Sequence, residues 1–199
     1  MSGLLDLSRL IDGMNTRIGR WLSWLILAAV IISATNAIIR KLFDTSSNSW
    51  LEMQWVLFGA VFLLCTPWTL LSNEHIRIDI VNNLFRKRTR DWIDVFGHVV
   101  FLLPFTIVML IVSVPFAKTS FLLNEQSANA GGLPQWPAKM LIPLGFLLLF
   151  LQAISELIKR LAIIQGKLED TTSGGGHHAA VEAEAERILA AAAEEAARR

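Results

Sequence analysis

Four long stretches without a charged side chain dominate the pattern of apolar and polar positions in this chain. They comprise 19 residues between Arg20 and Arg40, 21 between Glu52 and Glu74, 23 between Asp94 and Lys118, and 16 between Lys139 and Glu156. A helix needs about 20 apolar residues to cross a bilayer core that is about 30 Å thick. The pattern therefore predicts an all-α membrane protein in which residues 21–160 form a domain of four transmembrane helices.

A different pattern precedes the first stretch. Within residues 1–20, apolar side chains recur at spacings of three and four, at Leu4, Leu7, Ile11, Met14 and Ile18. This spacing predicts an amphipathic helix that lies in the membrane interface before the chain turns into the first span. Three glycines in this segment weaken a helix, so a frayed N-terminus is the alternative.

The connection between the second and third stretches has a similar character. Residues 76–85 place apolar side chains on one helical face, and a basic cluster of Arg86, Lys87, Arg88 and Arg90 follows. Strand-like alternation also fits residues 76–81, but an isolated strand at a membrane leaves its backbone unpaired. We therefore predict a second interfacial helix, and we expect the four basic side chains to contact anionic lipid head groups.

Residues 161–199 differ from the rest of the chain. A Gly-rich linker at 173–178 leads into a segment made almost wholly of Ala, Glu and Arg. Such a segment has too few large apolar side chains to build a packed core. The sequence predicts a cytoplasmic linker and tail with helical tendency, and it assigns the tail no role.

The distribution of basic residues predicts how the chain is oriented in the membrane. The chain is 53% hydrophobic and 18% charged, which leaves little of it for a soluble domain. Without the tail, eleven basic residues lie on the side of the two termini and the connection between the second and third spans, whereas four lie on the opposite side. Cytoplasmic loops carry the excess of Lys and Arg. The count therefore predicts a multi-pass protein with both termini in the cytoplasm.

Several classes of membrane protein are excluded by what the spans lack. No Asp, Glu, Lys or Arg lies deep within them, although ion-coupled carriers usually need such groups at mid-membrane. Cys65 is the single cysteine, so a thiol oxidase with cysteine pairs is excluded. No metal, cofactor, nucleotide or nucleophile motif appears. The sequence thus predicts an accessory subunit that is not an enzyme and uses no cofactor.

Several short motifs resemble the small membrane subunit of tripartite ATP-independent periplasmic (TRAP) transporters. The second span carries Glu52 near its start and the pair Gly59-Ala60 within it, and a His75-Ile76-x-x-Asp79 motif follows. Further similar pieces are Glu125-x-Ser127, Gly132-Leu-Pro-x-Trp136-Pro-x-Lys139 and Pro143-Leu-Gly145-Phe. The resemblance covers about residues 15–160, and the tail departs from it.

The resemblance implies a non-catalytic small permease subunit of a secondary transporter in a bacterial inner membrane. In such a system a periplasmic substrate-binding protein captures an organic acid, and a large membrane permease subunit moves it inward by symport with sodium ions. The small subunit scaffolds the large one and helps the binding protein to dock. The implied partners are these two proteins and membrane lipids, with no nucleic acid.

Two sets of site residues follow from this resemblance and from residue size. We expect contact with the large subunit at Glu52, Trp55, Gly59, Ala60 and Gly145, because small residues permit close helix approach. We expect docking of the binding protein at Glu125, Ser127 and Trp136, in the longest external loop.

Two alternative functions stay open at the level of sequence. The chain could be an accessory scaffold or assembly subunit of another membrane complex with no transport role. It could also be a small carrier that acts by homo-oligomerisation. A gene neighbourhood with a large permease and a secreted binding protein would favour the TRAP transporter subunit. Uptake of substrate by the chain alone would favour the small carrier.

Overall fold

The computed structural model describes residues 2–45, 47–72 and 87–168. Its helices are α1 (Ser2–Phe43), α2 (Asn48–Leu71), α4 (Lys87–Gly97), the π-helical turn η1 (His98–Leu102), α5 (Leu103–Leu122) and α6 (Trp136–Ile164). Four helical segments within the described ranges are long and apolar enough to cross a membrane. The predicted number of spans is confirmed, and the described part of the chain is helical apart from its loops.

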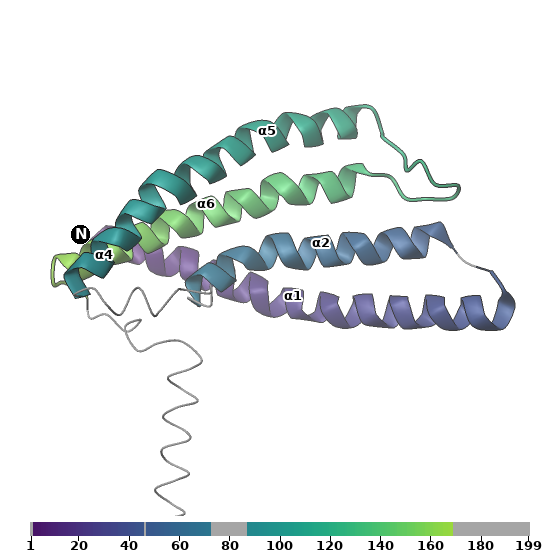
Figure 1. Cartoon of the computed structure of the whole chain (residues 1–199), viewed down its shortest axis with the longest axis horizontal. Coiled ribbons are helices and arrows are strands. Elements are labelled where there is room, and N and C mark those ends of the chain that lie inside the picture. The colour runs from purple at the N-terminus through teal and green to yellow at the C-terminus, as the bar shows by residue number, and fades with distance from the viewer. Residues whose placement is uncertain (1, 46, 73–86, 169–199) are drawn as a thin grey trace, which may run out of the picture.

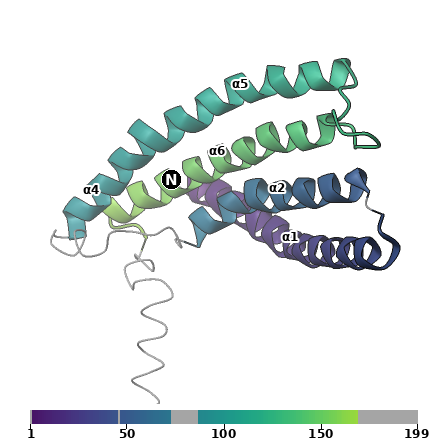
Figure 2. The same cartoon turned by 45° about the vertical axis from the view of Figure 1, so that its right-hand side comes forward.

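The helices lie side by side in one curved layer in the order α1, α2, α6, α5, as Figures 1 and 2 show. α6 is the central element, since it packs against α5, α2 and the N-terminal part of α1. Only 11 to 28% of the most apolar window of each span is buried within the chain. The layer therefore leaves both of its broad faces open, and lipid or another membrane protein must cover them.

α1 differs from the prediction for the N-terminal segment. It runs as one helix of 42 residues from Ser2 to Phe43, without a turn after Arg20. At 1.5 Å per residue such a helix is about 63 Å long, roughly twice the thickness of the bilayer core. The first 20 residues are therefore an extension of the first span and form no separate helix.

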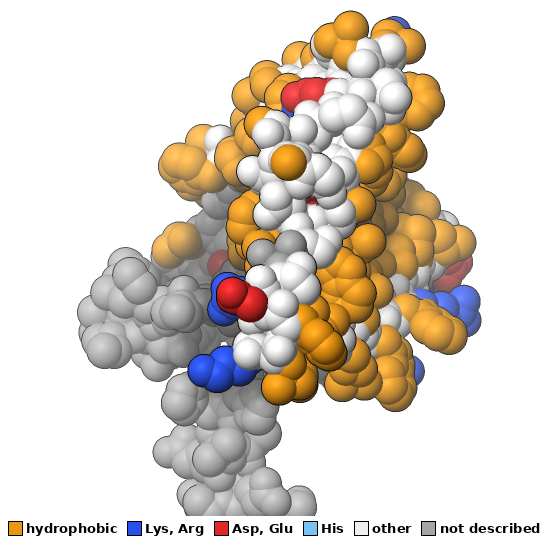
Figure 3. Space-filling view, turned by 90° about the vertical axis from the view of Figure 1, so that its right-hand side faces the viewer, with side chains coloured by type: hydrophobic (Ala, Val, Ile, Leu, Met, Phe, Trp, Pro, Cys, Tyr) orange, Lys and Arg blue, Asp and Glu red, His pale blue; other side chains and the backbone are white. Residues whose placement is uncertain are grey.

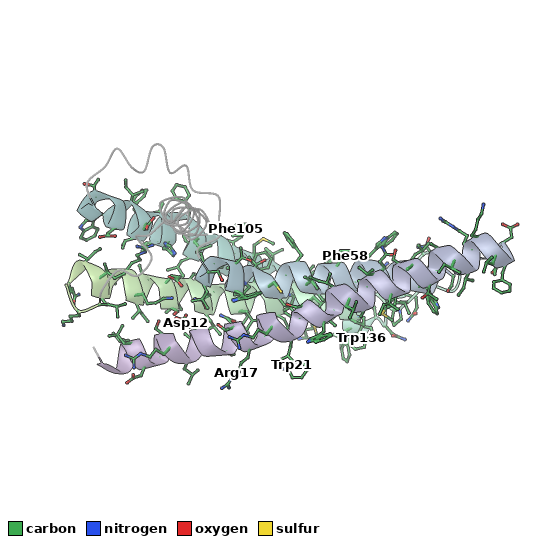
Figure 4. All side chains as sticks on the ribbon, turned by 90° about the horizontal axis from the view of Figure 1, so that it is seen from below. Asp12, Arg17, Trp21, Phe58, Phe105 and Trp136 are labelled. Carbon is green, nitrogen blue, oxygen red and sulfur yellow. The ribbon has the colours of Figure 1, made fainter. Side chains whose placement is uncertain are left out.

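The reason for this continuity is a set of polar contacts between α1 and α6. Asn15 Nδ2 donates a hydrogen bond of 2.6 Å to Gln152 Oε1, and Gln152 Nε2 donates one of 2.9 Å to Asp12 Oδ1. Lys159 Nζ lies 3.0 Å from Asp12 Oδ2 and 2.5 Å from Glu156 Oε1. In Figure 4, Asp12 points from α1 toward α6, whereas Arg17 and Trp21 point away from the other helices. The inward side of this part of α1 combines polar and apolar residues, since Ser8, Ile11 and Asn15 are all buried.

A second ionic contact joins α6 to α4. Arg160 is buried, and its guanidinium lies 3.2 Å from Asp94 Oδ2 and 3.6 Å from Asp91 Oδ1. Neighbouring residues of one helix point about 100° apart. Lys159 and Arg160 therefore contact α1 and α4 on different sides of α6.

Small residues set the closest helix contacts. A Cβ placed on Gly145 of α6 would lie 2.9 Å from both Cβ and the carbonyl oxygen of Leu63 on α2. A Cβ on Gly19 of α1 would lie 2.7 Å from the ring of Trp68 on α2. These glycines let the helices approach more closely than larger side chains would allow.

The third span is a continuous curved helix made of α4, η1 and α5. Pro104 has no N–H and disfavours regular helix in the preceding turn. The chain accommodates it with the π-turn His98–Leu102, which ends where the Leu103 N–H donates to the carbonyl oxygen of His98. Such turns are a common way for a helix to absorb a local disruption.

The predicted second interfacial helix falls mostly outside the described residues. Residues 73–86, including Arg86, are not described. Lys87, Arg88 and Arg90 lie on the first turn of α4, which continues into the third span. These three residues therefore belong to the end of a spanning helix.

Candidate functional site

The loop that connects α5 to α6 has a defined structure of its own. Its two sides are joined by hydrogen bonds from Ser127 N to Leu133 O, at 3.1 Å, and from Gln135 N to Glu125 O, at 2.8 Å. A β-bridge pairs Gln126 with Pro134. We call residues 123–135 the outer loop. In Figure 3, which faces this end of the molecule, a strip of uncharged polar and backbone atoms runs between hydrophobic side chains.

Glu52, in the second turn of α2, holds the outer loop in place. Its Oε1 accepts hydrogen bonds from Ser127 Oγ and, at 2.7 Å, from Asn129 Nδ2. Its Oε2 accepts one of 2.6 Å from the backbone N–H of Leu133. A carboxylate near the end of a span is costly unless it is paired or hydrated, and these three donors supply the pairing.

Gly132 is required for this arrangement. A Cβ at this position would lie 2.5 Å from Ser127 Cβ and 2.7 Å from Glu52 Oε1. Real Cβ atoms do not approach other heavy atoms so closely. The absence of a side chain at Gly132 therefore lets the loop fold against the carboxylate.

The start of α2 makes two further contacts with the tip of the outer loop. Asn48 Nδ2 donates a hydrogen bond of 3.0 Å to the carbonyl oxygen of Ala130. Ser49 Oγ donates one to the carbonyl oxygen of Gly131. Together with Glu52, these residues fix both sides and the tip of the loop to one helix end.

An ion pair fixes the base of the outer loop to α6. Lys139 Nζ lies 2.5 Å from Glu125 Oε2 and 4.5 Å from the centre of the Phe116 ring. The hydrogen bond from Lys139 holds the pKa of the Glu125 carboxyl below its ordinary value. Phe121 and Trp136 meet edge to face beside this pair, with ring centres 5.2 Å apart.

The predicted docking residues all lie in this structure, where they make contacts within the chain. Glu125 pairs with Lys139, Ser127 donates to Glu52, and Trp136 packs on Phe121. The exposed residues of the loop are 123, 124 and 126 and those of the loop tip, residues 128–131. The predicted residues therefore shape the outer loop, and its tip forms one continuous part of the exposed surface.

The residues predicted to contact a large subunit have different surroundings, and only some of them are exposed. Ala60 and Gly145 are buried within the layer, and Glu52 is engaged by the outer loop. Trp55 is 64% exposed on α2. Gly59 has no atom within 4 Å of the position that a Cβ would occupy, apart from its own neighbourhood in the helix.

Gly59 lines a cavity of about 460 Å³ beneath the outer loop. Its walls come from α2, from Phe116 of α5 and from the first turns of α6, and the loop closes its outer end. We call it the outer cavity.

Sequence reasoning did not identify Asn48, Ser49, Asn129 or Lys139 as parts of one structure. Polar residues at the starts of two helices and in a loop give no signal of which partners they will meet. The useful signal was Glu52 itself, because a carboxylate at that depth requires donors, and the outer loop is rich in them. Among the described residues, no group of three or more His, Cys, Asp or Glu side chains could hold a metal ion.

The comparisons with known proteins agree with this picture of a small membrane subunit. The family model described as "Tripartite ATP-independent periplasmic transporters, DctQ component" matches residues 29–162, which is most of the chain and includes α2, α5, the outer loop and nearly all of α6. No curated protein and no solved structure matches the chain significantly.

Proposed function

Because the chain belongs to the DctQ family of tripartite ATP-independent periplasmic transporters, we propose that it scaffolds the large permease subunit and presents the outer loop to a periplasmic binding protein. Subunits of this family are non-catalytic membrane components. In this proposal the large subunit carries an organic acid inward together with sodium ions. Family membership favours this role over the two alternatives left open by the sequence.

One observation carries the docking part of the proposal, namely the attachment of the outer loop to the start of α2. A free loop of this length would lose conformational entropy each time a partner bound it. Glu52 accepts three hydrogen bonds from the loop, so its conformation is fixed before any partner arrives. The exposed tip, residues 128–131, is then a preformed surface for the binding protein.

The scaffold part of the proposal rests on an exposed aromatic row along α2. Trp55, Phe58 and Phe62 are 64%, 51% and 76% exposed. Their spacing of three and four places them on one face of the helix. Large aromatic side chains supply much of the contact area in protein interfaces. We propose that this row packs on the large subunit and that Trp55 belongs to the contact.

The proposed orientation places the outer loop in the periplasm and both termini in the cytoplasm. The excess of basic residues on the side of the termini supports it. In this orientation Lys87, Arg88 and Arg90, on the first turn of α4, are at the cytoplasmic surface. Each basic residue near anionic lipid contributes about 1 kcal/mol to membrane attachment.

The proposal is tested by separating assembly from docking. The chain is purified with its large subunit, and capture of the binding protein by the complex is measured. Ala130→Arg at the exposed loop tip should reduce capture by about tenfold, which corresponds to about 1.4 kcal/mol, without reducing recovery of the large subunit. Thr45→Arg is the matched control, because it adds the same charge at an exposed position in the connection between α1 and α2.

Phe58→Ala tests the scaffold contact. We expect it to reduce recovery of the large subunit, because it removes the middle side chain of the exposed row.

Equal capture by the Ala130→Arg and Thr45→Arg complexes would contradict docking at the loop tip. Unchanged recovery of the large subunit with Phe58→Ala and Phe62→Ala combined would contradict the aromatic contact.

A further inference from the structure

The outer cavity has a polar end and an apolar end. At its outer end are the charged groups of Glu52 and Lys139 and the amide of Asn129. Deeper within the layer, its walls are formed by apolar side chains such as Val56, Leu63 and Ile142. A cavity divided in this way fits an amphipathic ligand, with a polar group at the membrane surface and a hydrocarbon chain below it.

The depth of the outer cavity matches one leaflet of a bilayer. Its lining runs along α2 from Glu52 to Leu63. Eleven residues of helix span about 16 Å, and half of a bilayer core about 30 Å thick is about 15 Å. Gly59 lies between these two residues and leaves the space in front of it open. A fatty acyl chain can therefore lie along α2 for the depth of the outer leaflet.

The charged groups at the outer end distinguish between lipid head groups. Glu52 and Lys139 line the cavity, and Glu125 lies beside it as the ion-pair partner of Lys139. These three side chains sum to one negative charge, which disfavours an anionic lipid. Two carboxylate oxygens offer about four acceptor positions. Oε1 of Glu52 accepts two hydrogen bonds and Oε2 accepts one, which leaves a position for an ammonium donor. Lys139 donates one of its three N–H groups to Glu125, so a phosphate oxygen can accept another.

We propose that the outer cavity binds one zwitterionic phospholipid with a primary ammonium group. Its phosphate contacts Lys139, its ammonium contacts Glu52, and one acyl chain passes Gly59 along α2. The lipid fills the space between α2 and α6 beneath the outer loop. It therefore becomes part of the surface of the helical layer. This inference does not depend on docking of a binding protein or on the aromatic row.

Native mass spectrometry of the purified full-length chain tests the proposal. The probes are phosphatidylethanolamine and phosphatidylglycerol, added in equal amounts after delipidation. We expect the wild-type protein to retain one phosphatidylethanolamine and to prefer it over phosphatidylglycerol. Gly59→Leu places a side chain in the path of the acyl chain and displaces two or three methylene groups, which should weaken binding by on the order of tenfold to a hundredfold.

Gly97→Leu on α4 is the matched control, because a Cβ there also meets no atom within 4 Å and the site lies far from the outer cavity. Ile142→Trp fills the same space from the α6 wall, so it keeps the test decisive if Gly59→Leu does not fold. The proposal is overturned if the wild type retains no lipid or prefers phosphatidylglycerol. It is also overturned if a folded cavity-filling variant retains lipid as the control does, or if the large subunit displaces the lipid on assembly.

Discussion

The hydrogen bond between Asn15 and Gln152 should be a measurable part of the attachment of α1 to α6. Gln152 is 0% exposed and Asn15 is 2% exposed, so water does not replace a partner that is removed. We compare Gln152→Leu, Asn15→Leu and the double variant, in which apolar side chains of similar size replace the polar ones. Gln165→Leu, at the exposed end of α6, is the control.

The two single changes should have unequal effects. Gln152→Leu removes three hydrogen bonds, and it leaves the buried amide of Asn15 without an acceptor. Stranding a buried donor costs about 1–3 kcal/mol, although single hydrogen bonds within membrane proteins average only about 0.6 kcal/mol. We therefore expect Gln152→Leu to lower the free energy of unfolding by about 1–3 kcal/mol.

Asn15→Leu should cost less, below about 1 kcal/mol, because it also removes a buried atom that is poorly satisfied. Among the described residues, Asn15 Oδ1 has no hydrogen-bond partner. The double variant should cost less than the two single costs together, since Gln152→Leu no longer strands an amide. The free energy is measured by titration with SDS, followed by far-ultraviolet circular dichroism and tryptophan fluorescence. A greater cost for Asn15→Leu than for Gln152→Leu, or strict additivity, would refute this reasoning.

Three further predictions concern packing, orientation and the tail. Gly145→Val should lower the free energy of unfolding by about 1–3 kcal/mol because the new Cβ meets Leu63. Gly59→Leu should change the free energy of unfolding by less than about 0.5 kcal/mol, because a Cβ there meets no atom within 4 Å. Equal effects in the same titration would contradict the packing described for α2 and α6. In a cysteine-free background, Asn129→Cys should react with an impermeant thiol reagent added outside the cell, and Arg88→Cys should not. The reverse pattern would contradict the proposed orientation. Truncation after Lys167 should leave co-purification with the large subunit unchanged, and loss of the complex would assign the tail a role in assembly.

The four spans could be predicted from the sequence because a bilayer imposes a length. Twenty or so uncharged residues have few alternatives to a helix when no water is present to bind the backbone. The third stretch, between Asp94 and Lys118, lies within a helical segment from Asp91 to Leu122, and the fourth lies within α6. Family membership, suggested by a handful of short motifs, is confirmed by the match to residues 29–162.

The arrangement of residues 1–20 could not be predicted from periodicity alone. The spacing identified the apolar and polar faces of α1, but a soluble protein buries the first and a membrane protein can do the reverse. Leu4 and Leu7 are about half exposed, whereas Ser8, Ile11 and Asn15 are buried, so the packed side takes residues from both faces. Which face packs inward depends on Gln152 and Ser155, which lie more than 130 residues away in the sequence.

The contact between Glu52 and the outer loop could not be predicted from the sequence either. The sequence located a carboxylate that needed partners and a polar loop that could supply them. It did not indicate that the two would meet, because Glu52 and Leu133 are 81 residues apart. That contact depends on the order of helices in the layer, which places the start of α2 beside the start of α6.

The ionic contacts of α6 have a consequence for biogenesis. A ribosome delivers α1, α2 and the third span to the membrane before α6 has been made. Asp12 therefore meets Lys159, and α4 meets Arg160, only after α6 has been made. Among the described helices α6 is the last to be inserted, and a nascent chain that stops before α6 lacks the central element that joins the first span to the third. Insertion of α6 thus completes the layer of described helices, which gives membrane quality control a simple criterion for recognising copies that lack it.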